Sequence, residues 1–164
     1  MRETLVVVVV AVGAAIVGLL TFVFIDNSSA PAVEEGHAPV AFRELASGDQ
    51  STIGRRVNYL VYSESQLAQL WDMIGAIDAP PKVDFANYTV IGIFSGKQPT
   101  AGYKIAAERI IDTDTRNVTI TTARPGASCF PAQAITQPYQ VIVVPNTSLS
   151  YALEYVPTTT SCLR

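Results

Sequence analysis

Few side chains in this sequence could carry chemistry. The 164 residues include two cysteines, Cys129 and Cys162, and one histidine, His37. A nucleophile activated by histidine needs that base beside it, but His37 lies in a stretch without apolar periodicity that we expect to be a linker. Neither cysteine has a second cysteine or a histidine at the spacing of zinc ligands. The sequence therefore predicts no enzyme activity, no cofactor and no metal site.

The charged residues do not favour any other chemistry. Asp112 and Asp114 share a polar turn, where such side chains ordinarily bond to the backbone. No glycine-rich phosphate-binding loop precedes a helix. The formal net charge is −3, and the sequence has no run of Lys or Arg. Because nucleic-acid binding needs a basic stripe, we expect no nucleic-acid partner.

The two cysteines can form a disulfide if the domain faces an oxidising compartment. A closed loop of about 33 residues would then contribute about 3 kcal/mol of stability. In a reducing compartment, the alternative is two free thiols.

Four asparagines lie in Asn-x-Ser/Thr sequons, which accept N-linked glycans in exported proteins of some organisms. These candidates are Asn27, Asn87, Asn117 and Asn146. Threonine-rich strands also produce sequons by chance, so the sequence leaves glycosylation open.

Residues 5–25 form an apolar run without a charged side chain. At about 1.5 Å per residue, a helix of this length crosses the roughly 30 Å hydrocarbon core of a membrane. The run exceeds the roughly 7–15 residues usual in a cleaved signal, so we predict a single-pass anchor. The alternative is a signal cleaved after Ala30-Pro31-Ala32. Arg2 precedes the run and no Lys or Arg follows until Arg43, which predicts a domain outside the cytoplasm, at the cell membrane.

The rest of the chain has the pattern of an α+β domain. We expect an anchor at residues 1–25, a linker at 26–40, a domain at 41–157 and a tail at 158–164. Ser63 and Gln66 form a capping-box pattern before a helix at 64–74, and runs of β-branched and aromatic residues predict strands. These strands are expected at 42–45, 57–62, 89–94, 103–111, 118–121, 140–144 and 149–156. The fold class is then a mainly antiparallel sheet with one packed helix.

The loop at residues 96–102 joins two predicted strands. Pro99 restricts the backbone, and Gly102 can supply a positive φ. The loop is either a structural turn or a rigid surface that presents Lys97, Thr100 and Tyr103. A second irregular segment, residues 123–137, runs into Pro138 and Tyr139. The candidate partner-binding residues from both segments are Gly96, Lys97, Pro99, Thr100, Gly102, Tyr103, Thr136, Pro138 and Tyr139.

These two segments also carry a family resemblance. Residues 94–103 read FSGKQPTAGY, and residues 133–141 read QAITQPYQV. Both resemble the C-terminal domain family of PrcB, which is a subunit of a protease complex. Weaker parts of the resemblance lie at residues 45–51, 63–71 and 83–85. It implies an exported, non-catalytic protein-binding domain that associates with or stabilises a surface protease, with a protease or another envelope protein as partner.

Two other functions remain open. Residues 99–103 also resemble the inhibitory loop of chagasin-type cysteine-protease inhibitors, which are β-sandwiches. The third possibility is a passive cell-surface module without a dedicated ligand.

Overall fold

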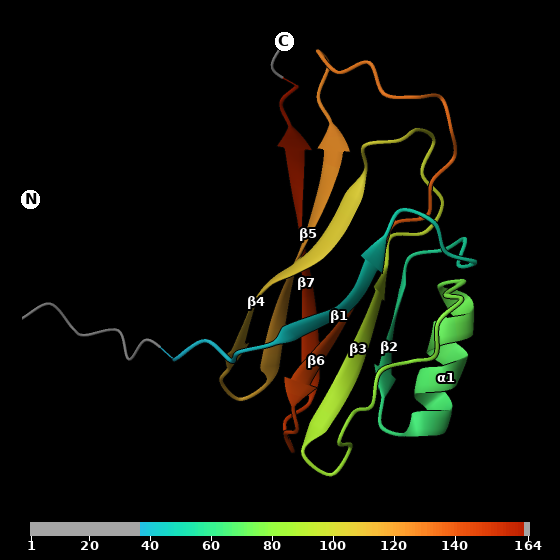
Figure 1. Ribbon diagram of the computed structural model, residues 1–164. Helices are drawn as coiled ribbons and strands as arrows, with labels where there is room; N and C mark the ends of the chain where they lie inside the picture. Colours follow the sequence, from blue (N-terminus) through green and yellow to red (C-terminus); the bar gives the residue numbers. More distant parts are fainter. Residues whose placement is uncertain (1–36, 163–164) are drawn as a thin grey trace, which may run out of the picture. The chain divides into compact units, whose positions relative to one another are not determined.

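The computed structural model describes residues 37–162, which form seven strands and one helix (Figure 1). Their order is β1 (Arg43–Gly48), β2 (Val57–Val61), α1 (Glu64–Met73), β3 (Tyr88–Phe94), β4 (Lys104–Asp112), β5 (Arg116–Pro125), β6 (Tyr139–Pro145) and β7 (Tyr151–Thr160). The predicted anchor at residues 5–25 and the sequon at Asn27 lie outside the described residues. Within the described part of the chain, no helix has the length and apolar character needed to cross a membrane.

Four strands form a fully antiparallel central sheet in the order β1-β6-β3-β2. Its middle strands, β3 and β6, are buried over almost their whole length. Both strands have continuous apolar sequences rather than alternating ones, which is the pattern of strands covered on both faces. Residues 89–94, which the sequence predicts as a strand, are therefore covered on both faces.

The remaining strands form a second sheet in the order β4-β5-β7. β4 and β5, both predicted as strands, form an antiparallel hairpin, but β5 and β7 are parallel. The expectation of a single sheet was wrong, because periodicity marks a strand without naming its partner. β7 also continues past the expected end at residue 156, since Thr158, Thr159 and Thr160 pair with the end of β5.

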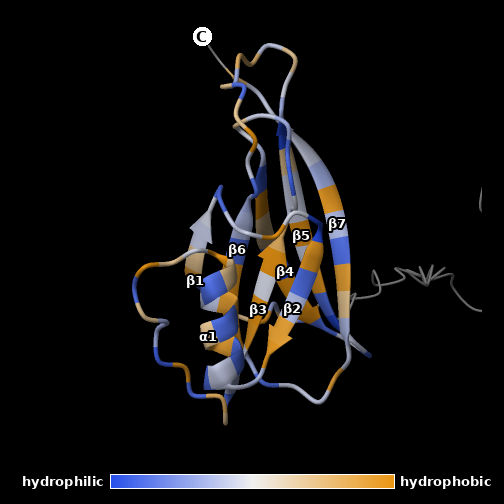
Figure 2. Cartoon of the chain, turned by 90° about the vertical axis from the view of Figure 1, so that its right-hand side faces the viewer, coloured by the Kyte–Doolittle hydropathy of each residue, from blue (hydrophilic) through white to orange (hydrophobic). Residues whose placement is uncertain are grey.

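The two faces of the central sheet contact different layers. α1 packs on one face with Leu67, Leu70 and Trp71, which join a buried cluster with β3 and β6. The second sheet covers the other face through a separate cluster that includes Ile91 and Ile120. The order of layers is therefore helix, four-stranded sheet, three-stranded sheet. In Figure 2, α1 carries both hydrophilic and hydrophobic residues, as expected of an amphipathic helix.

α1 begins at the N-cap that the capping-box pattern predicts. Ser63 is the N-cap, and its side chain accepts a hydrogen bond from the backbone N–H of Gln66 at 3.3 Å. The Gln66 side chain accepts from Tyr62 N–H at 2.7 Å rather than from the N-cap residue itself. Pro39 and Val40, which lie in the expected linker, pair with the end of β4.

Candidate functional site

Two loops far apart in the sequence lie side by side at one end of the domain (Figure 1). Residues 95–103 connect β3 to β4, and residues 131–138 precede β6; we call them the paired loops. Gln98 N–H donates to Thr136 O at 2.7 Å, and Thr136 N–H donates to Gln98 O at 3.1 Å. This isolated antiparallel bridge joins the centres of the two loops.

Three further hydrogen bonds fasten the paired loops along their length. The Thr136 hydroxyl donates to Thr100 O at 3.0 Å. Ala101 N–H donates to Ala132 O at 3.0 Å, and Ser95 N–H donates to Pro138 O at 2.9 Å. The two segments singled out from the sequence therefore form one continuous surface whose backbone is held in place.

The nine candidate residues separate by exposure. Lys97, Pro99 and Gly102 are exposed, whereas Thr100, Tyr103 and Tyr139 are partly buried. Gly96, Thr136 and Pro138 are buried. The buried three cannot contact a large partner directly, so their role is to hold the loops in position.

Tyr139 belongs to the fold more than to the surface. Its ring stacks on Phe94, with centroids 6.2 Å apart, and contacts the buried cluster beneath α1. Burial raises the pKa of Tyr139 above its ordinary value of 10.0. The hydroxyl therefore stays protonated throughout the physiological range.

Gly96 is required by a close approach of two backbones. Its φ is +74°, and a Cβ built there would lie 2.7 Å from Arg55 C and from Arg56 N. Lys97 N–H, the next residue along, donates to Gly54 O at 3.1 Å. Gly102 has a φ of +85°, which confirms the positive φ predicted for it.

We predict that Gly96→Ala lowers the free energy of unfolding by about 2 kcal/mol, because it adds a left-handed strain of roughly 1 kcal/mol to a steric collision. Urea denaturation measures the change. Gly75→Ala is the matched control, since Gly75 also has a positive φ, of 66°, but nothing within 4 Å of its Cβ position. Equal losses in the two variants would show that the contact with residues 55 and 56 contributes nothing.

The sequence did not single out two apolar side chains on or beside the paired loops. Ile135 is 57% exposed and Phe130 is 85% exposed. The sequence could have indicated them only as large apolar residues within an irregular segment that contains prolines. Ile135 adds an exposed apolar side chain to the paired loops, and Phe130 adds one just before the second of them.

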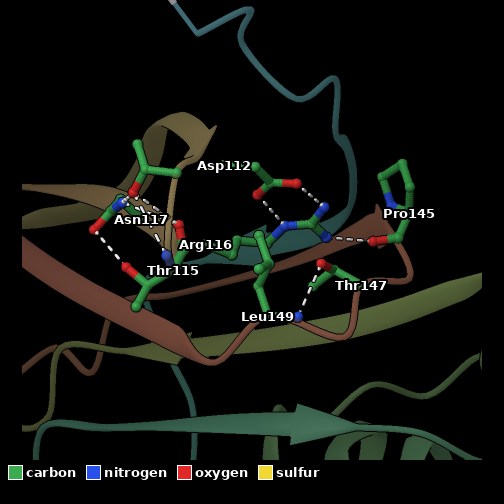
Figure 3. Close-up of polar contacts among 8 residues, drawn as sticks. Asp112, Thr115, Arg116, Asn117, Pro145, Thr147 and Leu149 are labelled. Carbon is green, nitrogen blue, oxygen red and sulfur yellow. Dashed lines mark hydrogen bonds and ion pairs between the residues drawn. The ribbon is translucent and has the colours of Figure 1, made fainter.

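The best-connected charged residues lie at the other end of the β4–β5 hairpin, where Asp112 and Arg116 flank the turn (Figure 3). The Arg116 guanidinium donates to both carboxylate oxygens of Asp112, at 2.7 Å each, and to Pro145 O. Arg116 is only 3% exposed. The hydrogen bond from Arg116 lowers the pKa of Asp112 below its ordinary value of 3.8. This ion pair fastens the hairpin turn to the end of β6 and has a structural role.

Among residues 37–162, no group of three His, Cys, Asp or Glu side chains is placed to hold a metal ion. The predicted disulfide between Cys129 and Cys162 is confirmed, with Cα atoms 5.2 Å apart. It joins the segment before the paired loops to the residues that follow β7.

The three sequons within the described residues have their side-chain amides engaged in the fold. Asn87 Nδ2 donates to Asp84 Oδ2 at 2.7 Å. Asn146 Nδ2 donates to the carbonyls of Phe85 and Ala86, and Asn117 Nδ2 donates within its own turn. A glycan on any of these nitrogens would compete with these hydrogen bonds. Glycosylation stays a prediction.

The fold and the paired loops define a β-rich domain with an ordered loop surface at one end. The family described as PrcB C-terminal matches residues 89–145. A PrcB C-terminal domain is therefore present, and the resemblance is confirmed over this part of the chain. The match runs from β3 to β6 and includes both paired loops, whereas the weaker motifs at residues 45–51, 63–71 and 83–85 lie outside it. No curated protein and no solved structure matches the chain.

Proposed function

We propose that this chain is a membrane-anchored, non-catalytic protein-binding domain outside the cytoplasm, which associates with or stabilises a surface protease. The observation that carries the proposal is the PrcB C-terminal match at residues 89–145, because it covers both paired loops. The apolar run at residues 5–25 supports the anchor. The disulfide supports an oxidising compartment.

The geometry of the paired loops supports their use as a contact surface. Binding costs less free energy when the contacting loops are already ordered, and the Gln98–Thr136 bridge orders both loops in the free domain. The exposed Lys97 and Pro99, with the 57% exposed Ile135, present a charge beside apolar side chains. Such a mixture is typical of protein interfaces.

We expect the double variant Lys97→Glu with Thr100→Arg to reduce capture of the protease at least about tenfold, since a reversed charge and a bulky side chain would oppose the partner's surface. The full-length proteins would be cross-linked in their native membranes, and the attached proteins identified and quantified by mass spectrometry. Lys82→Glu is the control, because this exposed lysine lies outside the paired loops. If every co-purifying protein stays bound to the double variant, the paired loops are not the contact site.

The same preparations test the two other functions. Inhibition of papain by a stoichiometric amount of the protein would favour the cysteine-protease inhibitor, and full papain activity in a large molar excess would exclude it. Cross-linking to neighbouring envelope proteins without any enriched partner would favour the passive surface module.

A further inference from the structure

The second sheet changes character along its inner face. On β5, Val118 and Ile120 are buried in the cluster between the sheets, but Thr122 and Arg124, next on the same face, line an open groove. On β7, Leu153 and Tyr155 pack against that cluster, and Pro157 and Thr159 then line the groove. The apolar interior thus ends before the strands do.

This change occurs because the strands of the two sheets differ in length. β5 and β7 have 10 residues each, whereas β2 has 5 and β3 has 7. The longer strands extend past the central sheet at the end where the paired loops lie (Figure 1). The groove between the extended strands and the central sheet has a volume of about 430 Å³.

The opposite wall of the groove comes from the central sheet and the paired loops. Arg56 stands just before β2, and Ser95 and Gln98 follow β3. Tyr103 and Lys104, at the start of β4, complete the lining beside the extended strands. Gln98 and Tyr103 therefore face the groove from the loop that carries Lys97 and Pro99 on its exposed side.

Three cations line the groove and no carboxylate does. Arg56 lies over the Tyr155 ring, with its Cζ atom 5.0 Å from the ring centroid. Arg124 Nε donates a hydrogen bond to the Thr159 hydroxyl at 3.4 Å. The one ion pair among residues 37–162 joins Arg116 to Asp112, so neither arginine nor Lys104 has an ion-pair partner in that range. A groove of positive charge in a protein of formal net charge −3 is complementary to an anionic ligand.

We propose that this groove binds an acidic peptide segment of the partner protein, whose carboxylates pair with Arg56, Lys104 and Arg124. This inference rests on the proposed function, since it assigns a chemistry to the partner of the paired loops. Arginine binds carboxylates through charge-assisted hydrogen bonds. The groove favours a peptide with several carboxylates over a small anion because its three cations come from separate parts of the chain, just before β2, on β4 and on β5.

The test uses the full-length protein in a non-ionic detergent, with a fluorescein-labelled hexaglutamate peptide as the probe and hexaglutamine as the matched peptide. Fluorescence anisotropy should report binding of hexaglutamate alone, weakening as sodium chloride is added. The double variant Lys104→Gln with Arg124→Gln should raise the Kd about tenfold, since each pair contributes up to about fivefold. Lys82→Gln, with its lysine outside the groove, should leave the Kd unchanged.

Each outcome bears on the inference separately from the proposed function. Absence of hexaglutamate binding, equal binding of the two peptides, or an unchanged Kd in the double variant would overturn the acidic-peptide site. Binding of dextran sulfate in place of hexaglutamate would also overturn it in favour of a polyanion site. The same variants would be cross-linked in their native membranes. If the double variant loses the peptide but retains the protease, the groove does not bind the partner, while the proposed function stands. If even the wild-type protein captures no protease, the proposed function fails whatever the peptide does.

Discussion

Replacing Arg116 with methionine should lower the free energy of unfolding by about 3 kcal/mol. The variant keeps most of the side-chain volume but removes the charge that pairs with Asp112 and bonds to Pro145 O. Removing one partner of a buried ion pair costs about 3–5 kcal/mol. We place the effect at the lower end, because the Asp112 side chain remains 32% exposed and water can hydrate it. Urea denaturation of the purified protein measures the change.

Arg109→Met is the matched control for this variant. Arg109 lies on β4 and is exposed, so its loss removes one positive charge without breaking a buried pair. We expect its effect to stay within about 0.5 kcal/mol. A loss of similar size in both variants would mean that net charge, rather than the pair with Asp112, determines the stability.

The pH dependence gives an independent test of the Arg116 ion pair. Because Arg116 lowers the pKa of Asp112 in the folded protein, the ionised carboxylate stabilises the fold above its unfolded pKa of about 4. This contribution is lost as the pH falls through the lower pKa of the folded state. The stability difference between wild type and Arg116→Met should therefore narrow below about pH 4. Hydrogen bonds from Ser47 and Gln140 also lower the pKa of Glu44, but that effect is common to both proteins.

Elements that depend on local sequence were predictable. The helix follows from an N-cap at Ser63 and an apolar stripe, both of which are readable within a dozen residues. The β4–β5 hairpin follows from the polar turn between Asp112 and Arg116. The division into two sheets was not predictable. β5 and β7 are parallel neighbours, but β6, which lies between them in the sequence, belongs to the other sheet.

The candidate site shows the same limit. The family motifs singled out residues 94–103 and 133–141, which lie side by side in the structure, but they did not tell exposed residues from buried ones. Thr136 reads as a surface residue in a polar sequence, yet it is only 3% exposed because both its backbone and its hydroxyl bond to the other loop. The groove was beyond prediction, since it depends on the relative lengths of strands in two different sheets.

Removing the disulfide through Cys129→Ser with Cys162→Ser should lower the free energy of unfolding by about 3 kcal/mol. The bond spans a sequence separation of 33, and the cross-link restricts the unfolded chain by an amount that grows with the closed loop. The folded state should persist, because Gly126 N–H still donates to Thr160 O at 2.9 Å beside the lost bond. Urea denaturation compares the variant with the wild type, and chemically reduced wild type serves as the control. A loss below about 1 kcal/mol would show that the unfolded chain is already restricted in another way.

The same disulfide variant separates the stability of the domain from the positioning of the paired loops, the proposed contact surface. Between Cys129 and Thr136 the chain is also held by Ala132, whose carbonyl accepts from Ala101 N–H. The Gln98–Thr136 bridge does not depend on the disulfide. Capture of the protease should therefore fall much less in this variant than in Lys97→Glu with Thr100→Arg, although the disulfide variant is the less stable protein. The opposite order of capture, measured below the unfolding transition of both proteins, would mean that the disulfide positions the paired loops.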